Sequence, residues 1–141
     1  MSWPAELAAD GHVHVLVGLV TDFGGRFLLS RRQAAQHMAG AWEFPGGKKR
    51  ADETRFEALR RELAEELGIG VEGAEPLLEL VHDYPDRRVK LDVWLVHEYR
   101  GEPTAQEGQP LRWVDLDDLG DAGLLEADRP IVEALRARER G

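Results

Sequence analysis

The sequence predicts an α/β sandwich, in which helices cover a β-sheet. Short segments rich in Val, Ile and Leu alternate with turn residues, and two longer segments have helical periodicity. A length of 141 residues with 43% hydrophobic content suits one domain with a sizeable core. We therefore treat residues 1–141 as a single domain, with residues 1–11 as a lead-in segment.

The first third of the chain predicts three short strands. Residues 12–21 are apolar and β-branched, and the turn residues 22–25 lead into a returning strand over residues 26–31. Residues 41–44 predict a further short strand, which runs into a glycine-rich loop over residues 45–48.

The next segment, residues 54–67, predicts one amphipathic helix. Gly68 is the residue expected just past a helix end, and Asp52 is a candidate cap before Glu53. The apolar stripe of this helix consists of Phe56, Leu59, Leu63 and Leu67.

The second half predicts more strands and a last helix. Residues 71–76 are predicted as a connection, and residues 77–84 and 89–99 as two strands joined by a turn at residues 85–88. A polar loop follows over residues 100–110.

The C-terminal segment begins with a short strand over residues 111–114 and one helical turn over residues 115–120. Asp128 is predicted to cap the last helix, and Pro130 to lie in its first turn. The buried stripe of that helix is predicted to be Ile131, Val132 and Leu135.

Three glutamates on the first helix are placed at a cost. Glu62, Glu65 and Glu66 fall within about a third of the helix circumference, and a like-charge pair four residues apart is unfavourable by roughly 0.2–0.5 kcal/mol. Glutamates in the last turn also oppose the helix dipole. A solvated charged face is one interpretation, but a bound divalent cation would reverse both penalties, and hard cations prefer carboxylate oxygens.

Composition excludes several function classes. The net charge of −9 disfavours binding to polymeric nucleic acid but allows a small anionic substrate held by a metal. The absence of cysteine excludes disulfides, a thiol nucleophile and zinc–cysteine sites, and it fits a cytoplasmic location. No secretory signal or membrane-spanning run is visible, so no membrane partner is expected.

The spacing of residues 47–69 resembles the Nudix box, with no position missing. Gly47, Glu53, the run Arg61-Glu62-Leu63, the pair Glu65-Glu66 and the pair Gly68-Ile69 stand at the box positions. The resemblance implies the Nudix fold, a mixed β-sheet sandwiched between α-helices. It also implies hydrolysis of a nucleoside diphosphate linked to another group, with Mg²⁺ (or Mn²⁺) held by glutamates of the helix.

Further segments are similar to the bacterial MutT branch, over roughly residues 13–136. They include Ser30-Arg31-Arg32, Glu43-Phe44-Pro45-Gly46-Gly47-Lys48, Tyr84-Pro85-Asp86-Arg87 and Glu107-Gly108-Gln109-Pro110. This resemblance implies hydrolysis of 8-oxo-dGTP or a related nucleoside triphosphate to the monophosphate and pyrophosphate, as a nucleotide-pool sanitation enzyme in a monomer or small homo-oligomer.

The same resemblance assigns roles to individual residues. The nucleotide would contact Arg32 and His37, with the base and sugar site lined by Glu43, Phe44, Pro45 and Gly46. The Gly46 carbonyl and Glu66 would hold metal, supported by Glu62 and Glu65. Glu107 would be a further metal ligand or a base. Glu53 or Glu107 would accept the proton from water, and Arg61 would orient Glu53.

Asp128 departs from the MutT pattern, which has an asparagine at the start of the last helix to read the oxidised purine. An ionised aspartate only accepts hydrogen bonds, whereas asparagine donates and accepts. Related enzymes that act on CTP, dCTP and modified cytosine nucleotides carry Ala-Asp here. A CTP/dCTP or broad-specificity pyrophosphohydrolase is therefore the alternative. A non-catalytic Nudix module and an ADP-ribose enzyme fit less well, because every box glutamate is present and no ADP-ribose context is visible.

Overall fold

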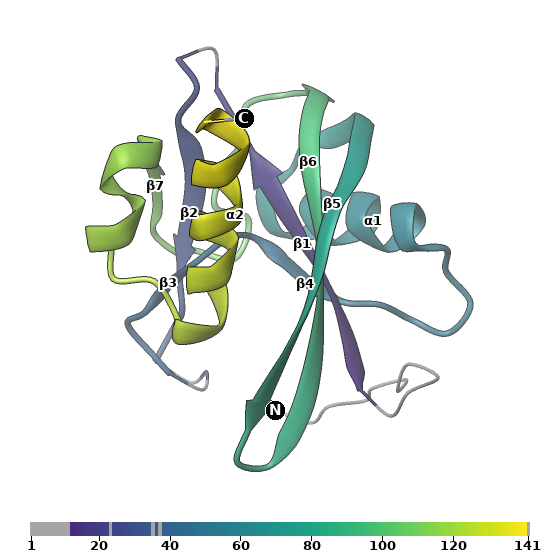
Figure 1. The fold of residues 1–141 in the computed structure, drawn as a ribbon. Helices are drawn as coiled ribbons and strands as arrows, with labels where there is room; N and C mark the ends of the chain where they lie inside the picture. Colours follow the sequence, from purple (N-terminus) through teal and green to yellow (C-terminus); the bar gives the residue numbers. More distant parts are fainter. Residues whose placement is uncertain (1–11, 23, 35, 37, 141) are drawn as a thin grey trace.

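The structure, a computed structural model, describes residues 12–22, 24–34, 36 and 38–140. The predicted lead-in and His37 lie outside the described residues. Within these ranges, strands form two sheets, and α1 (Arg55–Leu67) and α2 (Arg129–Arg140) lie on opposite sides of the central one (Figure 1).

The central sheet has four strands in the order β4-β1-β6-β5 among the described residues. These strands are β1 (Val13–Val20), β4 (Gly46–Lys48), β5 (Gly70–Tyr84) and β6 (Arg87–Arg100). β1 runs parallel to β6, while the β1–β4 and β5–β6 pairs are antiparallel. The predicted mixed sheet between helices is thus confirmed.

A second, antiparallel sheet has the order β3-β2-β7 and consists of β3 (Trp42–Glu43), β2 (Phe27–Arg31) and β7 (Leu111–Val114). All three strands were expected from the sequence. Ser30 in β2 pairs with Glu43 on one side and with Leu111 on the other. This register sets Ser30 of β2 beside Glu43 of β3, and the Ser30 hydroxyl donates to Glu66 of α1.

Helix α1 is closed at both ends by local hydrogen bonds. Thr54 is the N-cap and forms a capping box with Glu57, so the predicted cap at Asp52 is wrong. Asp52 lies two residues too early, in the turn that precedes the helix. Gly68 ends the helix in the left-handed conformation, with φ 69°, as predicted.

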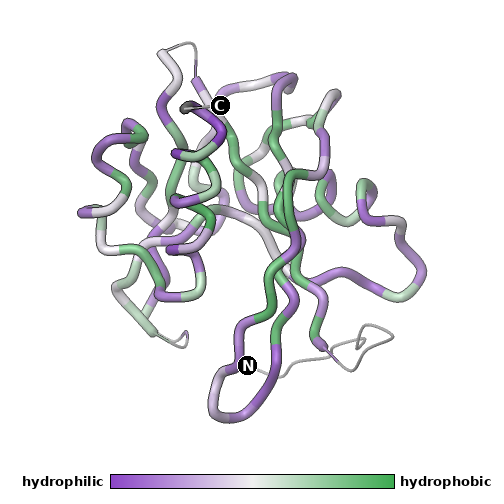
Figure 2. Tube along the Cα trace, viewed as in Figure 1, coloured by the Kyte–Doolittle hydropathy of each residue, from purple (hydrophilic) through white to green (hydrophobic). Residues whose placement is uncertain are grey.

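The core lies on both faces of the central sheet. On one face Leu16 and Val20 pack with Leu59 and Leu63 of α1. On the other, Val17 and Leu19 of β1 pack with the predicted stripe of α2, which is Ile131, Val132 and Leu135. Because β1 is buried on both sides, its sequence is almost continuously apolar. Figure 2 shows hydrophobic residues along the central strands and hydrophilic residues over the loop into α1.

Two predicted loops are strands in the structure. Residues 71–76 belong to β5, an edge strand, where one solvent-facing side tolerates glutamates and Pro76. Residues 46–48 form β4, because Gly46 lets β4 approach β1 closely: a Cβ there would lie 1.9 Å from the Leu16 carbonyl oxygen. The β5–β6 turn is also tighter than predicted, since Arg87 and Arg88 already belong to β6.

The segment between β7 and α2 contains two short 3₁₀ helices, η1 (Leu116–Asp121) and η2 (Glu126–Asp128). The first confirms the predicted helical turn over residues 115–120. The second ends at Asp128, so this residue enters the site from the start of α2, with Pro130 in the first turn of that helix. No helix in the described part of the chain is long and apolar enough to span a membrane.

Candidate active site

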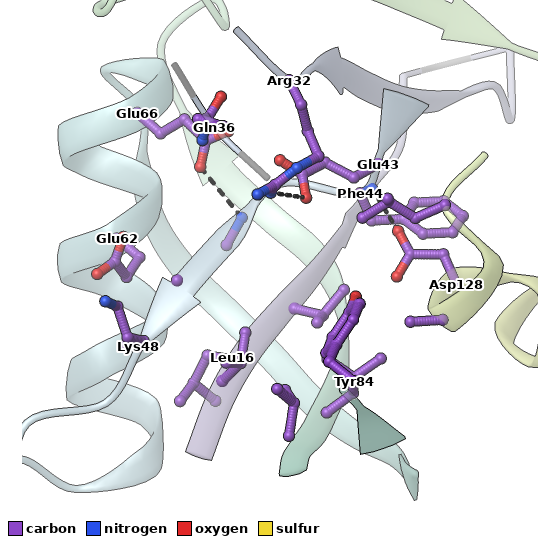
Figure 3. Close-up of a pocket in the computed structure, with 18 of the residues that line it drawn as sticks. Leu16, Arg32, Gln36, Glu43, Phe44, Lys48, Glu62, Glu66, Tyr84 and Asp128 are labelled. Carbon is purple, nitrogen blue, oxygen red and sulfur yellow. Dashed lines mark hydrogen bonds and ion pairs between the residues drawn. The ribbon is translucent and has the colours of Figure 1, made fainter. Parts of the chain in front are cut away.

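A pocket of about 430 Å³ lies between α1, the central sheet and the start of α2 (Figure 3). Its two ends differ in chemistry. One end carries Glu62, Glu66 and Lys48, and the other carries Phe44, Tyr84 and Asp128 (Figure 3). Of the predicted site residues, those that line the pocket are Arg32, Glu43, Phe44, Gly46, Glu62, Glu66, Glu107 and Asp128.

Glu66 is held at the carboxylate end by two hydrogen bonds. Its Oε2 accepts from the Gly46 N–H at 3.1 Å, and its Oε1 accepts from the Ser30 hydroxyl at 3.0 Å. Ser30 is 2% exposed and was not predicted as a site residue. The available signal was a hydroxyl in an otherwise apolar buried strand, since a buried hydroxyl needs a partner.

Glu62 reaches the pocket across the flat backbone of Gly47. A Cβ at Gly47 would lie 2.2 Å from Glu62 Oε2, so any other residue there would displace this carboxylate. Gly47 therefore leaves space for Glu62, which lies fifteen positions later in the chain. The spacing of the box does not by itself reveal this contact.

Arg61 connects the segment before α1 to two glutamates of the helix. Its guanidinium contacts Glu53 at 2.9 Å, Glu62 at 2.8 Å and Glu65 at 3.2 Å, and it donates to the Lys48 carbonyl at 3.0 Å. The structure thus contains the expected Arg61–Glu53 ion pair. The hydrogen bond from Arg61 lowers the pKa of Glu53 to about 2.

Glu65 does not line the pocket. Its side chain is 52% exposed and contacts Arg61 at 3.2 Å, through the same Nη1 that donates to Glu62. Pro45 also stays outside the pocket lining, since it is buried and its carbonyl accepts from the Gly18 N–H at 2.8 Å.

Burial and repulsion from neighbouring carboxylates disfavour the ionised forms of Glu62 and Glu66. Burial, with repulsion from Glu43 and Glu107, raises the pKa of Glu66 to about 8. Burial also raises the pKa of Glu62, against the pull of Arg61. A divalent cation between these groups would favour their ionised forms, so the donor set fits one.

The carboxylates do not form a closed cage. Among the described residues, no three or more acidic or histidine side chains are grouped closely enough to hold a metal by themselves. Carboxylates placed in this way can hold a divalent cation when substrate phosphates complete its ligand set.

The opposite end of the pocket is apolar with a single carboxyl group. Phe44 is 3% exposed and Asp128 is 4% exposed, and Asp128 Oδ2 accepts from the Phe44 N–H at 3.1 Å. Burial, followed by repulsion from Glu43, raises the pKa of Asp128 to about 7. Its carboxyl group therefore serves the Phe44 backbone as well as facing the pocket.

Arg32 and Glu43 form an ion pair at 2.9 Å between the two ends. Burial raises the pKa of Glu43 although Arg32 opposes the shift. Tyr84 and Arg87, from the β5–β6 hairpin, also line the pocket here, and neither is predicted as a site residue from the sequence. The hairpin brings them in from more than fifteen residues beyond α1, a distance that no local pattern predicts.

Comparison with known proteins identifies the family. The model of the NUDIX domain matches residues 16–134. The chain belongs to the NUDIX family. Its Nudix box runs from the Gly47 of β4 through α1 to Ile69, just past the Gly68 cap.

Individual relatives of this Nudix chain lie in the MutT-like branch. The 8-oxo-dGTP diphosphatase of Escherichia coli K12 is 36% identical, over 88% of this chain and 96% of that protein. The CTP pyrophosphohydrolase of the same organism is also 36% identical, over 86% and 90%. The solution structure of the E. coli ORF135 protein superposes with a TM-score of 0.81 at 34% identity, covering 91% of each chain. Nudix hydrolases of this kind generally use a divalent metal ion.

Proposed function

We propose that this Nudix hydrolase is a Mg²⁺-dependent nucleoside triphosphate pyrophosphohydrolase that releases a nucleoside monophosphate and pyrophosphate. The observation that carries the proposal is the two-ended pocket. Carboxylates of Glu62, Glu66 and Glu107 stand at one end, and the ring of Phe44 with the Asp128 carboxyl stands at the other. A nucleoside triphosphate has the same polarity, with its base at one end and its phosphates at the other.

The residues proposed to hold the ion are Glu62, Glu66 and the Gly46 carbonyl, and Glu65 stays a predicted ligand. A bound Mg²⁺ (or Mn²⁺) would neutralise phosphate charge and lower the pKa of the attacking water. Ser30 and the Gly46 N–H keep Glu66 in place, and Lys48 supplies a positive charge for a phosphate. Water attacks one phosphorus of a phosphoanhydride linkage. The bond from that phosphorus to the bridging oxygen breaks, and the attacking water loses a proton.

Glu107 is the better candidate to accept that proton. Glu53 has a pKa of about 2, and its two oxygens already accept hydrogen bonds from Arg61 and from the Arg50 N–H. A carboxylate that is so strongly stabilised is a weak base. We therefore assign Glu53 to orienting Arg61, which contacts Glu62, and Glu107 to proton transfer.

We propose 8-oxo-dGTP as the first candidate substrate and CTP or dCTP as the second. The first is supported by the 8-oxo-dGTP diphosphatase relative, and the second by Asp128 together with the CTP pyrophosphohydrolase relative. With a pKa of about 7, Asp128 is present near neutral pH in both forms. Its protonated form donates and accepts, as asparagine does, and its ionised form only accepts.

A substrate panel tests this function. The wild type and Asp128→Asn are assayed for pyrophosphate release from 8-oxo-dGTP, dGTP, CTP, 5-methyl-dCTP and ADP-ribose. We expect 8-oxo-dGTP to be preferred, and Asp128→Asn to weaken the cytosine nucleotides relative to it. Failure to release pyrophosphate from any triphosphate would contradict the proposed reaction, and an unchanged ranking in the variant would contradict the role of Asp128.

The remaining expectations concern location and assembly. We propose that the chain acts on free nucleotides, without polymeric nucleic acid or a membrane, in the cytoplasm and as a monomer or small homo-oligomer. The acidic net charge of −9 supports the first of these expectations.

A further inference from the structure

The last carbonyls of α1 are bound by the loop that precedes β7. The carbonyls of a last helical turn have no partner inside the helix. Here the Leu67 carbonyl accepts from the Thr104 N–H at 2.9 Å. The Glu66 carbonyl accepts from the Gln106 N–H at 3.2 Å and from Gln109 Nε2 at 3.1 Å. The backbone of a candidate metal ligand is thereby tied to a loop about forty residues away.

Gln109 is the side chain that completes this tie. It is 5% exposed, and its Oε1 accepts from the Glu107 N–H at 3.1 Å while its Nε2 donates to the Glu66 carbonyl. A carbonyl can only accept and a backbone N–H can only donate, so these two partners fix which way the amide points. Gln109 does not line the pocket.

The loop needs such a tie at Glu107. The carboxylate of Glu107 faces the pocket, where it repels both Glu62 and Glu66. Gly108, with φ 76°, makes the reversal that brings the Glu107 N–H over the Gln109 side chain. Hydrogen bonds on either side of Glu107 thus hold the loop against the end of α1, although its carboxylate is repelled by those of Glu62 and Glu66.

We propose that Gln109 is a positioning residue, which fixes Glu107 relative to Glu66 by binding the backbone of both. This inference rests on the proposed function, in which Glu107 accepts the proton. Gln109 touches no reacting atom, so it acts only through Glu107. Removing it should impair turnover more than substrate binding, and should matter little once the Glu107 carboxylate is gone.

The test is a double-mutant cycle of Gln109→Met with Glu107→Gln. Methionine has a similar length and forms neither hydrogen bond. We expect Gln109→Met to lower kcat by roughly 10–100-fold, as changes to partners of catalytic ligands do, with KM changed by less than about threefold. In the Glu107→Gln background the same substitution should lower kcat by less than about threefold. Gln106→Met is the matched control, because its exposed side chain contacts Thr104 within the same loop, and it should leave kcat unchanged.

A second measurement does not depend on activity. Hydrogen exchange at the Glu107 amide should accelerate at least about tenfold in Gln109→Met and stay at the wild-type rate in Gln106→Met. Should Gln109→Met not fold, Gln109→Asn serves instead, since its amide is one methylene too short to span both partners. Mn²⁺ affinity of each variant shows whether Glu66 has moved, and we expect it to fall less than kcat.

Two results would overturn the inference. One is an unchanged Glu107 amide exchange rate in the folded Gln109 variant. The other is a loss of kcat on adding Gln109→Met to Glu107→Gln that is as large as the loss in the wild-type background. Such a loss would mean that Gln109 acts independently of Glu107. If the wild type hydrolyses no nucleotide, the proposed function fails, and the exchange measurement alone decides the role of Gln109.

Discussion

Gly47 decides where Glu62 can lie, because no side chain fits between them. Adding one methyl group places a carbon 2.2 Å from Glu62 Oε2, so either the carboxylate or β4 has to move. At the residue scale, the box glycine and the box glutamate are therefore one unit. Ser30 fixes Glu66 in a different way, because its hydroxyl donates a hydrogen bond to the Glu66 carboxylate.

The first prediction concerns Gly47→Ala. We expect kcat to fall by roughly 10–100-fold, because Glu62 is displaced, while the protein still folds. Gly70→Ala is the control, since a Cβ at Gly70 meets nothing within 4 Å, and its kcat should match the wild type. Equal kcat values for the two variants, measured under saturating Mg²⁺ and substrate, would contradict the packing argument.

Ser30→Ala gives the second prediction at this scale. The variant removes one of the two hydrogen bonds on Glu66 and leaves the Gly46 N–H in place. We expect kcat to fall by about tenfold and the free energy of unfolding to change by no more than about 1.5 kcal/mol. Steady-state kinetics and denaturant titration measure both, and a wild-type kcat would show that Ser30 does not orient Glu66.

At the scale of elements, α1 is fastened to the central sheet at its first residue. Asp92 in β6 is fully buried, and its carboxylate accepts from Arg55 at two distances of 2.7 Å, from His14 at 2.8 Å and from the Trp94 indole at 2.8 Å. Arg55 also lies 5.0 Å from the centre of the Trp94 ring. This cluster sets the start of the helix that carries Glu62 and Glu66.

Asp92 should make stability depend on pH in the acid range. Burial would raise the pKa of Asp92, but the hydrogen bonds from Arg55, His14 and Trp94 outweigh it and hold the pKa well below its ordinary value of 3.8. A lowered folded-state pKa contributes stability above pH 3.8 that is lost as the pH falls below it. Unfolding free energies at pH 7 and pH 3 should differ more in the wild type than in Asp92→Asn.

The same cluster predicts the cost of its removal. Asp92→Ala leaves the Trp94 indole N–H and His14 without their acceptor and should cost about 1–3 kcal/mol at pH 7, the usual penalty for buried donors that lose a partner. Arg55 adds little to this cost because its side chain is 42% exposed. The exposed Asp83–Arg88 pair is the control, and Asp83→Asn should cost no more than about 1 kcal/mol. Similar losses in both variants by chemical denaturation would contradict the fastening role.

The N-cap of α1 is predicted at Asp52 from the sequence but lies at Thr54 in the structure. Thr54→Ala should destabilise the protein by about 1 kcal/mol because it breaks the capping box with Glu57, while Asp52→Ala should be within about 0.5 kcal/mol of the wild type. A larger loss of unfolding free energy in Asp52→Ala than in Thr54→Ala would indicate that Asp52 is the N-cap.

At the scale of the whole molecule, local patterns predicted most elements but not how they meet. The helical period of apolar residues predicts α1, the β-branched run predicts β1, and the apolar run after a turn predicts β2. The strand β4 was missed because its glycines have no propensity of their own and pair only where β1 accepts them closely.

The candidate site shows the same division. Glu62 and Glu66 were predicted from one helix face, and the structure brings both to the pocket. Glu65 shares that face in projection, yet Arg61 engages it at the surface. Ser30 and Gln109 reach α1 from other elements, and Tyr84 reaches the opposite end of the pocket from the end of β5. These positions depend on how the elements pack, so no spacing rule could have found them.

The most direct test of the account is pyrophosphate release from 8-oxo-dGTP by the wild type and by Glu66→Gln at saturating Mg²⁺. Glu72→Gln, on the exposed side of β5, controls for the loss of one charge. We predict measurable turnover in the wild type and in Glu72→Gln, and a loss of more than about a hundredfold in Glu66→Gln with its unfolding temperature nearly unchanged. Near-normal turnover in Glu66→Gln would contradict the assignment of the α1 carboxylates to catalysis.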